Sequence, residues 1–198
     1  QFSIQGTDRS ITLKELAISS FNKTLFPPDH ELGLGGAAEY KAEQPNYPNG
    51  CHICEVEIDP ETGKIWVVKY TVIDDVGTVI NPLLLDGQIH GGVAQGLGQI
   101  LFEDILYDNN SGQLLTGSFM DYVMPRSDDI PEIIVEVSPA PTDTNPLGIK
   151  GAGEAGTIGA MPCVMNAAID ALSPIGIDHL DMPLTPDRVW RALNAKNR

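Results

Sequence analysis

Alternating apolar and polar residues run through two stretches of the chain, 51–58 and 64–73, and the sequence Asp-Pro-Glu-Thr-Gly at 59–63 separates them. A period of two is typical of strands with one buried face, and Asp, Pro and Gly favour tight turns. The two stretches therefore predict a β-hairpin. An apolar run at 133–137 predicts a further strand, and the polar segment 108–112 predicts a second, shorter hairpin.

Helical spacing of apolar residues is found in four other segments. A Thr-x-x-Glu capping box predicts a short helix from 12 to about 24. Asn-Pro at 81–82 begins a glycine-rich helix that extends to about 102, and two later helices are expected at about 162–172 and after Thr185. Because helices and strands are mixed without regular β-α-β alternation, the expected fold class is α+β.

The composition narrows the classes of protein to consider. The chain has 198 residues, 42% of them apolar, which is enough for one sizeable domain or two small ones. Four prolines and four glycines at 26–50 predict an irregular connection. A net charge of −15 disfavours nucleic acid and anionic membranes as partners. With three cysteines, no signal-like start and no apolar run of about 20 residues, we expect a cytoplasmic protein without a membrane span.

Cys51 and Cys54 form a C-x-x-C pair, a pattern found in zinc sites and redox dithiols. Residues three apart on a strand face opposite sides, and no second cysteine pair is present to complete four ligands. We therefore favour a structural role for both cysteines and expect no metal ligands in this chain.

Five glycines lie in the expected helix at 87–98, and each costs roughly 1 kcal/mol relative to alanine. Four of them form two pairs spaced four residues apart, so close packing of a neighbouring backbone would explain them. The approach of a bulky cofactor would explain them equally well, with Gln88 and Gln95 offering amide groups to it. The spacing alone leaves both explanations open.

Gly151-Ala152-Gly153-Glu154-Ala155-Gly156 matches the G-x-G-x-x-G pattern of dinucleotide-binding folds. That pattern should directly follow a strand, whereas the nearest expected strand ends near Val137 and a proline-rich stretch intervenes. The segment does supply a flexible backbone whose N–H groups can approach an anionic ligand, with the Glu154 carboxylate in its middle. A buried carboxylate in such a loop can act as a general base, and an exposed, solvated glutamate is the simpler alternative.

Several motifs occur together in a fixed order. They are Asp59-Pro60-Glu61-Thr62-Gly63, Asp74-Asp75-Val76-Gly77, Ile80-Asn81-Pro82, Gly87-Gln88-Ile89-His90-Gly91-Gly92, Gln95-Gly96-Leu97-Gly98 and the run from Asn145 to Gly156. Through these motifs nearly the whole chain resembles the molybdopterin-binding large subunit of the xanthine and aldehyde oxidase superfamily. The resemblance is greatest to its carbon monoxide dehydrogenase-like branch.

The resemblance implies that residues 1–198 are a C-terminal segment of the molybdopterin-binding domain. Glu154 matches the family's catalytic glutamate beside molybdenum, and Gln88 matches a glutamine near the cofactor. The backbone that lines the molybdopterin site is matched by Lys150, Gly151, Ala152 and Gly153. Members of this family oxidise an aldehyde, carbon monoxide or a related small carbon substrate, with water as the oxygen source.

The resemblance also implies which groups lie outside the chain. The cofactor would be molybdopterin, with the cytosine dinucleotide form as one option, while iron–sulfur clusters and FAD would be held by partner subunits. The remainder of the large subunit would complete the site, so the chain alone is not expected to be catalytic. A non-catalytic split or degenerate domain used in assembly is the alternative, and a nucleotide-binding domain is a third interpretation.

Overall fold

The computed structural model describes residues 1–25 and 29–195, and its contacts divide the chain into two compact units, Gln1–Lys41 and Ala42–Arg198. In the first unit, strands β1 (Phe2–Ser3) and β2 (Ser10–Ile11) pair antiparallel and precede helix α1 (Leu13–Ser19).

The predicted capping box of α1 is confirmed. The Thr12 hydroxyl accepts from the Glu15 amide, and the Glu15 carboxylate accepts from the Thr12 amide. The helix ends at Ser19 rather than near 24. The Asn22 side chain accepts from the backbone and hydroxyl of Thr24, and such local bonds compete with helical backbone hydrogen bonds.

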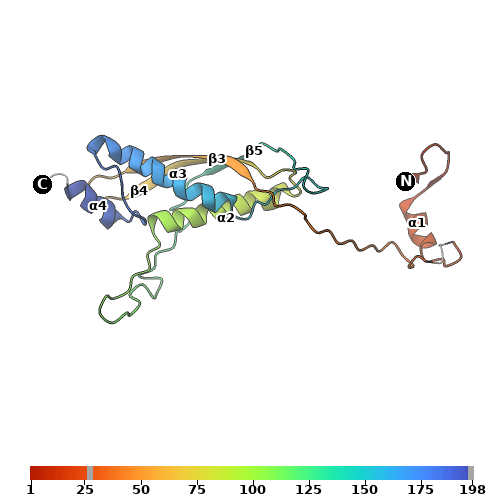
Figure 1. The fold of residues 1–198 in the computed structure, drawn as a ribbon, viewed down its shortest axis with the longest axis horizontal. Coiled ribbons are helices and arrows are strands. Elements are labelled where there is room, and N and C mark those ends of the chain that lie inside the picture. Colours follow the sequence, from red (N-terminus) through yellow and green to blue (C-terminus); the bar gives the residue numbers. More distant parts are fainter. Residues whose placement is uncertain (26–28, 196–198) are drawn as a thin grey trace. The chain divides into compact units, whose positions relative to one another are not determined.

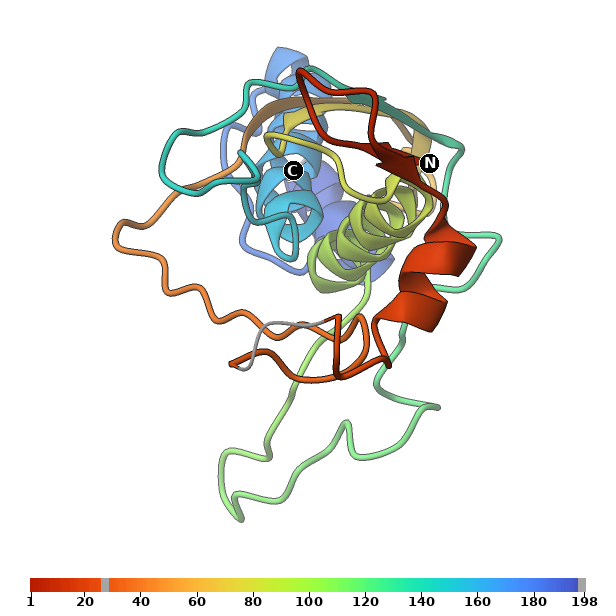
Figure 2. The same ribbon diagram turned by 90° about the vertical axis from the view of Figure 1, so that its right-hand side faces the viewer.

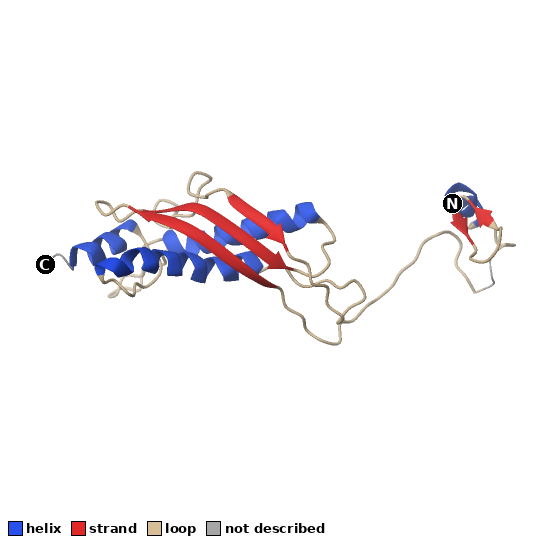
Figure 3. Ribbon diagram, turned by 90° about the horizontal axis from the view of Figure 1, so that it is seen from above, coloured by secondary structure: helices blue, strands red, loops and turns tan. Residues whose placement is uncertain are grey.

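The second unit is a three-stranded sheet with helices on one of its faces. Strand β3 (Asn49–Ile58) pairs antiparallel with β4 (Ile65–Asp75), which pairs parallel with β5 (Ile133–Val137). Helices α2 (Pro82–Leu101) and α3 (Ala155–Leu172) lie side by side beneath the sheet (Figures 1 and 3). The end-on view in Figure 2 shows the same two layers in this unit. This mixture of elements confirms the α+β fold class.

The β3–β4 hairpin is also confirmed, and its turn shows why the sequence predicts it. The Asp59 carboxylate accepts from the Glu61 amide at 2.9 Å and from the Thr62 hydroxyl at 2.6 Å. Gly63 has a φ of +74° and lies against the backbone of α4 (Pro186–Ala195), where a Cβ would be 2.3 Å from the Pro186 carbonyl oxygen. The turn therefore needs glycine both for its backbone angle and for the close approach of α4.

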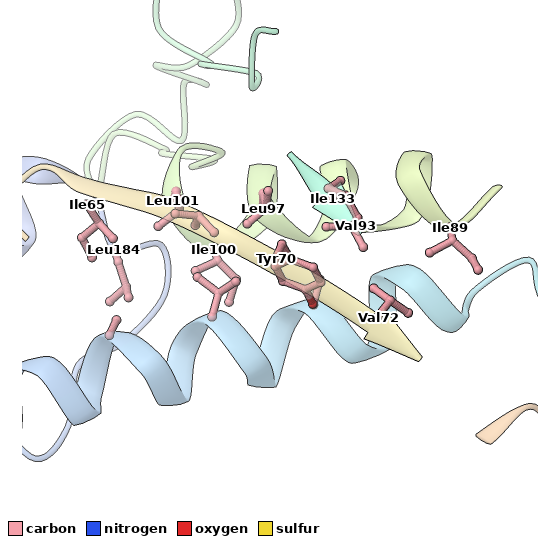
Figure 4. Close-up of a cluster of buried hydrophobic side chains, with 14 of the residues drawn as sticks. Ile65, Tyr70, Val72, Ile89, Val93, Leu97, Ile100, Leu101, Ile133 and Leu184 are labelled. Carbon is pink, nitrogen blue, oxygen red and sulfur yellow. The ribbon is translucent and has the colours of Figure 1, made fainter. Parts of the chain in front are cut away.

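The core of this unit lies between β4 and the two long helices (Figure 4). Inward side chains alternate along β4, and α2 and α3 present apolar faces at helical spacing. The residues buried most completely are Tyr70, Val72, Ile89, Val93, Leu97, Ile100, Ala160, Val164, Ala168 and Val189. Helix α2 begins at its Asn81 cap and ends at Leu101, as expected.

Helix α3 begins at Ala155, seven residues before the predicted start at 162. Pro162 lies inside the helix, where it leaves the carbonyl of Ile158 without its usual partner. Ile158 is 63% exposed, so the break in hydrogen bonding lies on an outer face rather than in the core. The expectation of flexible backbone over 151–156 was therefore wrong from Ala155 onward.

The predicted hairpin around 108–112 reduces to a turn. The Asp108 carboxylate accepts from the amides of Asn110 and Ser111, but the flanking backbone forms only a single bridge between Tyr107 and Leu114. Residues 103–132, all of them described, contain no strand. The turn chemistry was predicted correctly, and the strands that should have flanked it are absent because few of their side chains are buried.

The helical stretch Ala155–Ile175, which includes the short 3-10 helix η1 (Ser173–Ile175), is by length and composition apolar enough to cross a membrane. This length was not predicted from the sequence, because the glycines before 162 are typical of a loop rather than of a helix. Core helices of other proteins meet the same criterion, and α3 contacts both α2 and β3. Its buried side chains follow one face and are Ala160, Val164, Ala168 and Leu172. This pattern supports a core helix.

Candidate functional site

The glycine-rich loop at 151–153 is anchored to the end of β4 by Lys150. Its Nζ lies 2.5 Å from the Asp75 carboxylate, and its amide donates to the Val76 carbonyl at 2.9 Å. Asp75 also accepts from the amides of Gly77 and Ala140. These donors, with Lys150 contributing most, lower the pKa of Asp75 to about 2. Asp75 thus ties three chain segments together at the entrance to the loop.

Asp75→Asn should make the chain less stable at neutral pH and flatten its acid dependence. The pKa of Asp75 is depressed on folding, so its stabilising effect is complete above its ordinary value of 3.8 and is lost as the pH falls toward about 2. Urea unfolding at a series of pH values should show the wild-type and variant curves converging in that window. Asp128→Asn, a change at an exposed aspartate, is the control. Curves that stay parallel down to pH 2 would contradict the assignment.

Gln88 and Gly153, two of the predicted cofactor-binding residues, are brought together across 65 positions of sequence. The Gln88 side-chain amide, on α2, donates to the Gly153 carbonyl at 3.0 Å. Gly151 and Gly153 are exposed, and no atom lies within 4 Å of the place where a Cβ would stand on either. The loop thus presents open backbone on one side while Gln88 and Lys150 hold it in place.

Glu154 is the N-cap residue of α3, and its side chain does not cap the helix. It is exposed in this chain, so the burial that a general base would need is not supplied by the described residues. Glu154 directly precedes the first turn of α3, and the N-terminus of a long helix favours negative charge. The G-x-G-x-x-G segment does open a helix, but no strand directly precedes it, as expected.

A cavity of about 470 Å³ lies beside this loop, between the start of α3 and the adjacent ends of β3 and β4. Glu154, Gly151 and Gly153 form one wall. The other lining residues are Asn46, Tyr47, Pro48, Asn49, Gly50, His52, Asp74, Ala155, Ile158 and Gly159. The cavity lining does not include Lys150, Ala152 or Gln88.

Three residues in or beside the cavity were not predicted from the sequence as site residues. His52 Nδ1 lies 2.7 Å from the Tyr70 hydroxyl, and its Nε2 lies 3.5 Å from Asp74 Oδ1. The side chains of His52 and Asp74 are only 6% and 3% exposed. Asp74 Oδ2 is buried and has no hydrogen-bond partner among the described residues. His52 could have been identified from the alternation along β3, which places its side chain on the inward face of the strand.

The cysteines are arranged as the strand pattern predicts. Cys51 is exposed, whereas Cys54 is half-buried with its Sγ 3.6 Å from the Cys163 carbonyl. The neighbouring Cys54 thiol lowers the pKa of Cys163 to about 6, and the same contact together with burial raises the pKa of Cys54. Burial raises the pKa of Tyr70, whose hydroxyl also faces Cys163. Residues 1–25 and 29–195 contain no group of three or more side chains suited to a metal ion.

Residues 1–131 match a family model described as the molybdopterin cofactor-binding domain. The chain belongs to this family. The matched range includes Gln88, whereas Glu154 lies beyond it and is covered by alignments to whole relatives.

Two of these relatives are large subunits. The nicotine 6-hydroxylase large subunit of Paenarthrobacter nicotinovorans is 38% identical over 96% of this chain, and the carbon monoxide dehydrogenase large chain of Afipia carboxidovorans is 34% identical over the same share. The chain spans 23% of the length of each.

Solved structures show the same correspondence. The reconstituted CO dehydrogenase from Oligotropha carboxidovorans superimposes with a TM-score of 0.86 at 34% identity, covering 94% of this chain and 23% of that one. Quinoline 2-oxidoreductase from Pseudomonas putida 86 gives 0.81 at 35% identity, covering 91% and 23%. Both the fold and the sequence family of this chain are therefore those of molybdopterin-binding subunits.

Proposed function

We propose that this chain forms one side of the molybdenum-cofactor site of a molybdenum hydroxylase, as a C-terminal segment, residues 1–198, of its large subunit. The observation that supports this most directly is the cavity that gathers Glu154, the open glycine loop and the first turn of α3. These groups fit an anionic, bulky cofactor, because the loop leaves room for it and the helix amides lack a side-chain cap.

In this proposal the chain's own residues bind and accept protons. Gly151, Ala152 and Gly153 offer backbone to the cofactor, while Lys150 and Gln88 fix the loop from behind. Glu154 acts as the general base that removes a proton during oxidation. When bound, the cofactor supplies the two-electron oxidising centre that activates water as the oxygen source. The substrate would be an aldehyde, carbon monoxide or a related small carbon compound.

The remaining assignments follow from the same proposal. The cofactor would be molybdopterin in its cytosine dinucleotide or simpler form, and partner subunits would carry iron–sulfur clusters and FAD. The rest of the large subunit would cover Glu154 and supply the burial missing from the described residues. Such an assembly would be cytoplasmic. The exposed apolar side chains on the open face of the sheet, among them Trp66 and Val68, fit contact with further protein.

Gln88→Ala in the full-length enzyme tests the proposed site directly. Removing the amide that holds the Gly153 carbonyl should loosen the loop and lower molybdenum and pterin content per subunit. The turnover of the loaded fraction should fall less than it does when the base itself is removed. Gln99→Ala, a change at another exposed glutamine of α2 outside the cavity lining, is the matched control. Full cofactor content and unchanged turnover in Gln88→Ala would contradict the site.

A further inference from the structure

The Asp74–His52–Tyr70 network has no part in the roles assigned so far. Asp74 and His52 line the same cavity as Glu154 but come from the two neighbouring strands opposite it. We propose that His52 and Asp74 form a pair that accepts the proton from Glu154, an inference that rests on the proposed role of Glu154. Tyr70 positions His52 for this transfer.

The physical reason is an unbalanced buried charge. With His52 neutral, the Asp74 carboxylate carries a negative charge at 3% exposure, and its Oδ2 has no hydrogen-bond partner among the described residues. Burial without full pairing disfavours such a charge. Taking up one proton would bring the pair from a net charge of −1 to zero. Both residues line the cavity, so a proton that crosses it can reach the pair.

The orientation of His52 is fixed from three sides. The Tyr70 hydroxyl contacts Nδ1 at 2.7 Å, and the two rings meet edge-on with an interplanar angle of 87°. Gly159 of α3 lies against the imidazole so closely that a Cβ there would be 2.4 Å from it. With Tyr70 donating to Nδ1, Nε2 carries the hydrogen and lies 3.5 Å from Asp74 Oδ1, while the buried Oδ2 has no partner among the described residues.

The proposed transfer is a simple exchange. The O–H bond of the protonated Glu154 carboxyl breaks, directly or through a water in the cavity, and a new bond to the proton forms on the His52–Asp74 pair. Glu154 returns to its carboxylate, and no electrons are exchanged. The ionisable groups facing His52 are Tyr70 and Asp74 from β4, and Cys163 from α3, with Glu154 across the cavity.

The test uses the assembled, cofactor-loaded enzyme with His52→Gln and Asp74→Asn. Each should lower kcat on the order of 10- to 100-fold, as expected when a supporting group beside a catalytic centre is lost. The solvent deuterium isotope effect should rise, and added imidazole should restore turnover as a concentration-dependent proton carrier. Molybdenum content and KM should stay near wild type. A purely structural role would produce neither the isotope effect nor the rescue.

Matched controls come from a second His–Asp pair. His179 Nε2 lies 3.2 Å from Asp181 Oδ1, and both side chains are at least 80% exposed. His179→Gln and Asp181→Asn make the same chemical changes outside the cavity lining and should leave kcat and the isotope effect unchanged.

Two further outcomes separate the proposals. Near-normal turnover in the loaded Glu154→Gln enzyme overturns the role of Glu154 as the base. If Glu154→Gln is inactive while His52→Gln turns over at the wild-type rate, only the proton-accepting pair is overturned. If a variant at His52 or Asp74 fails to fold, Tyr70→Phe provides the test of the proposal. It removes only the hydroxyl on His52 Nδ1, so the pH profile of kcat should shift, and an unchanged profile overturns the proposal.

Discussion

Glu154→Gln in the full-length, cofactor-loaded enzyme is expected to lower turnover by roughly 10²- to 10⁴-fold, the usual contribution of general acid–base catalysis. Glutamine keeps the size and hydrogen-bonding capacity of glutamate but cannot take up a proton. Glu154 makes no capping bond to α3, so its replacement should not disturb the start of the helix. Molybdenum content should therefore remain near that of the wild type.

The measurement pairs steady-state rates with metal and pterin content on the same preparation, so that a loss of base is separated from a loss of cofactor. Glu61→Gln, at an exposed position of the hairpin turn, controls for the general effect of removing a carboxylate. The turnover of Glu154→Asp should lie between those of Glu154→Gln and Glu61→Gln, because aspartate keeps the proton acceptor but shortens its reach. A fully loaded Glu154→Gln enzyme that turns over normally would exclude Glu154 as the base.

The elements predicted correctly are those fixed by local chemistry. The hairpin follows from strand alternation and the Asp59 turn, and α2 follows from its Asn81 cap and apolar spacing. Strand β5 was predicted from its apolar run, but its parallel pairing with β4 could not be predicted. In each case the residues that determine the structure are within a few positions of one another.

The features that could not be predicted from the sequence depend on contacts between residues far apart in the chain. Gly156 and Gly159 look like loop residues, yet they lie in α3. Glycine is needed at both positions because α2 and His52 occupy the space where side chains would stand. The contacts among His52, Tyr70 and Asp74 join two strands and have no spacing that a motif could express. The loop carrying Glu154 was identified through resemblance, and the described residues leave Glu154 exposed.

Close packing, one of the two explanations left open for the α2 glycines, is confirmed at two positions, and the approach of a cofactor stays a prediction. A Cβ at Gly92 would lie 3.0 Å from the Cα of Gly156, and one at Gly96 would lie 2.6 Å from the Cβ of Ala160. These two glycines are buried and admit α3 closely. Gly87 and Gly91 are exposed, and neither has an atom within 4 Å of the place where a Cβ would stand.

Alanine at the packed glycines should therefore destabilise the chain. A Cβ at Gly156 would stand 2.6 Å from the Ile89 carbonyl oxygen, and backbone cannot move aside as a flexible side chain can. Gly92→Ala and Gly156→Ala should each cost about 1–3 kcal/mol, the range for overpacked contacts. Because the two residues touch, the double variant should lose less than the sum of the single ones. Urea unfolding gives all three values.

Gly87→Ala supplies the contrasting result. In the isolated chain it should raise the free energy of unfolding by up to about 1 kcal/mol, because alanine is the better helix former and the space is open. If the cofactor side of the enzyme covers this face beside Gln88, the same change should lower molybdenum content in the full-length protein. Stabilisation in both proteins, with full cofactor content, would show that the exposed glycines of α2 do not face the cofactor.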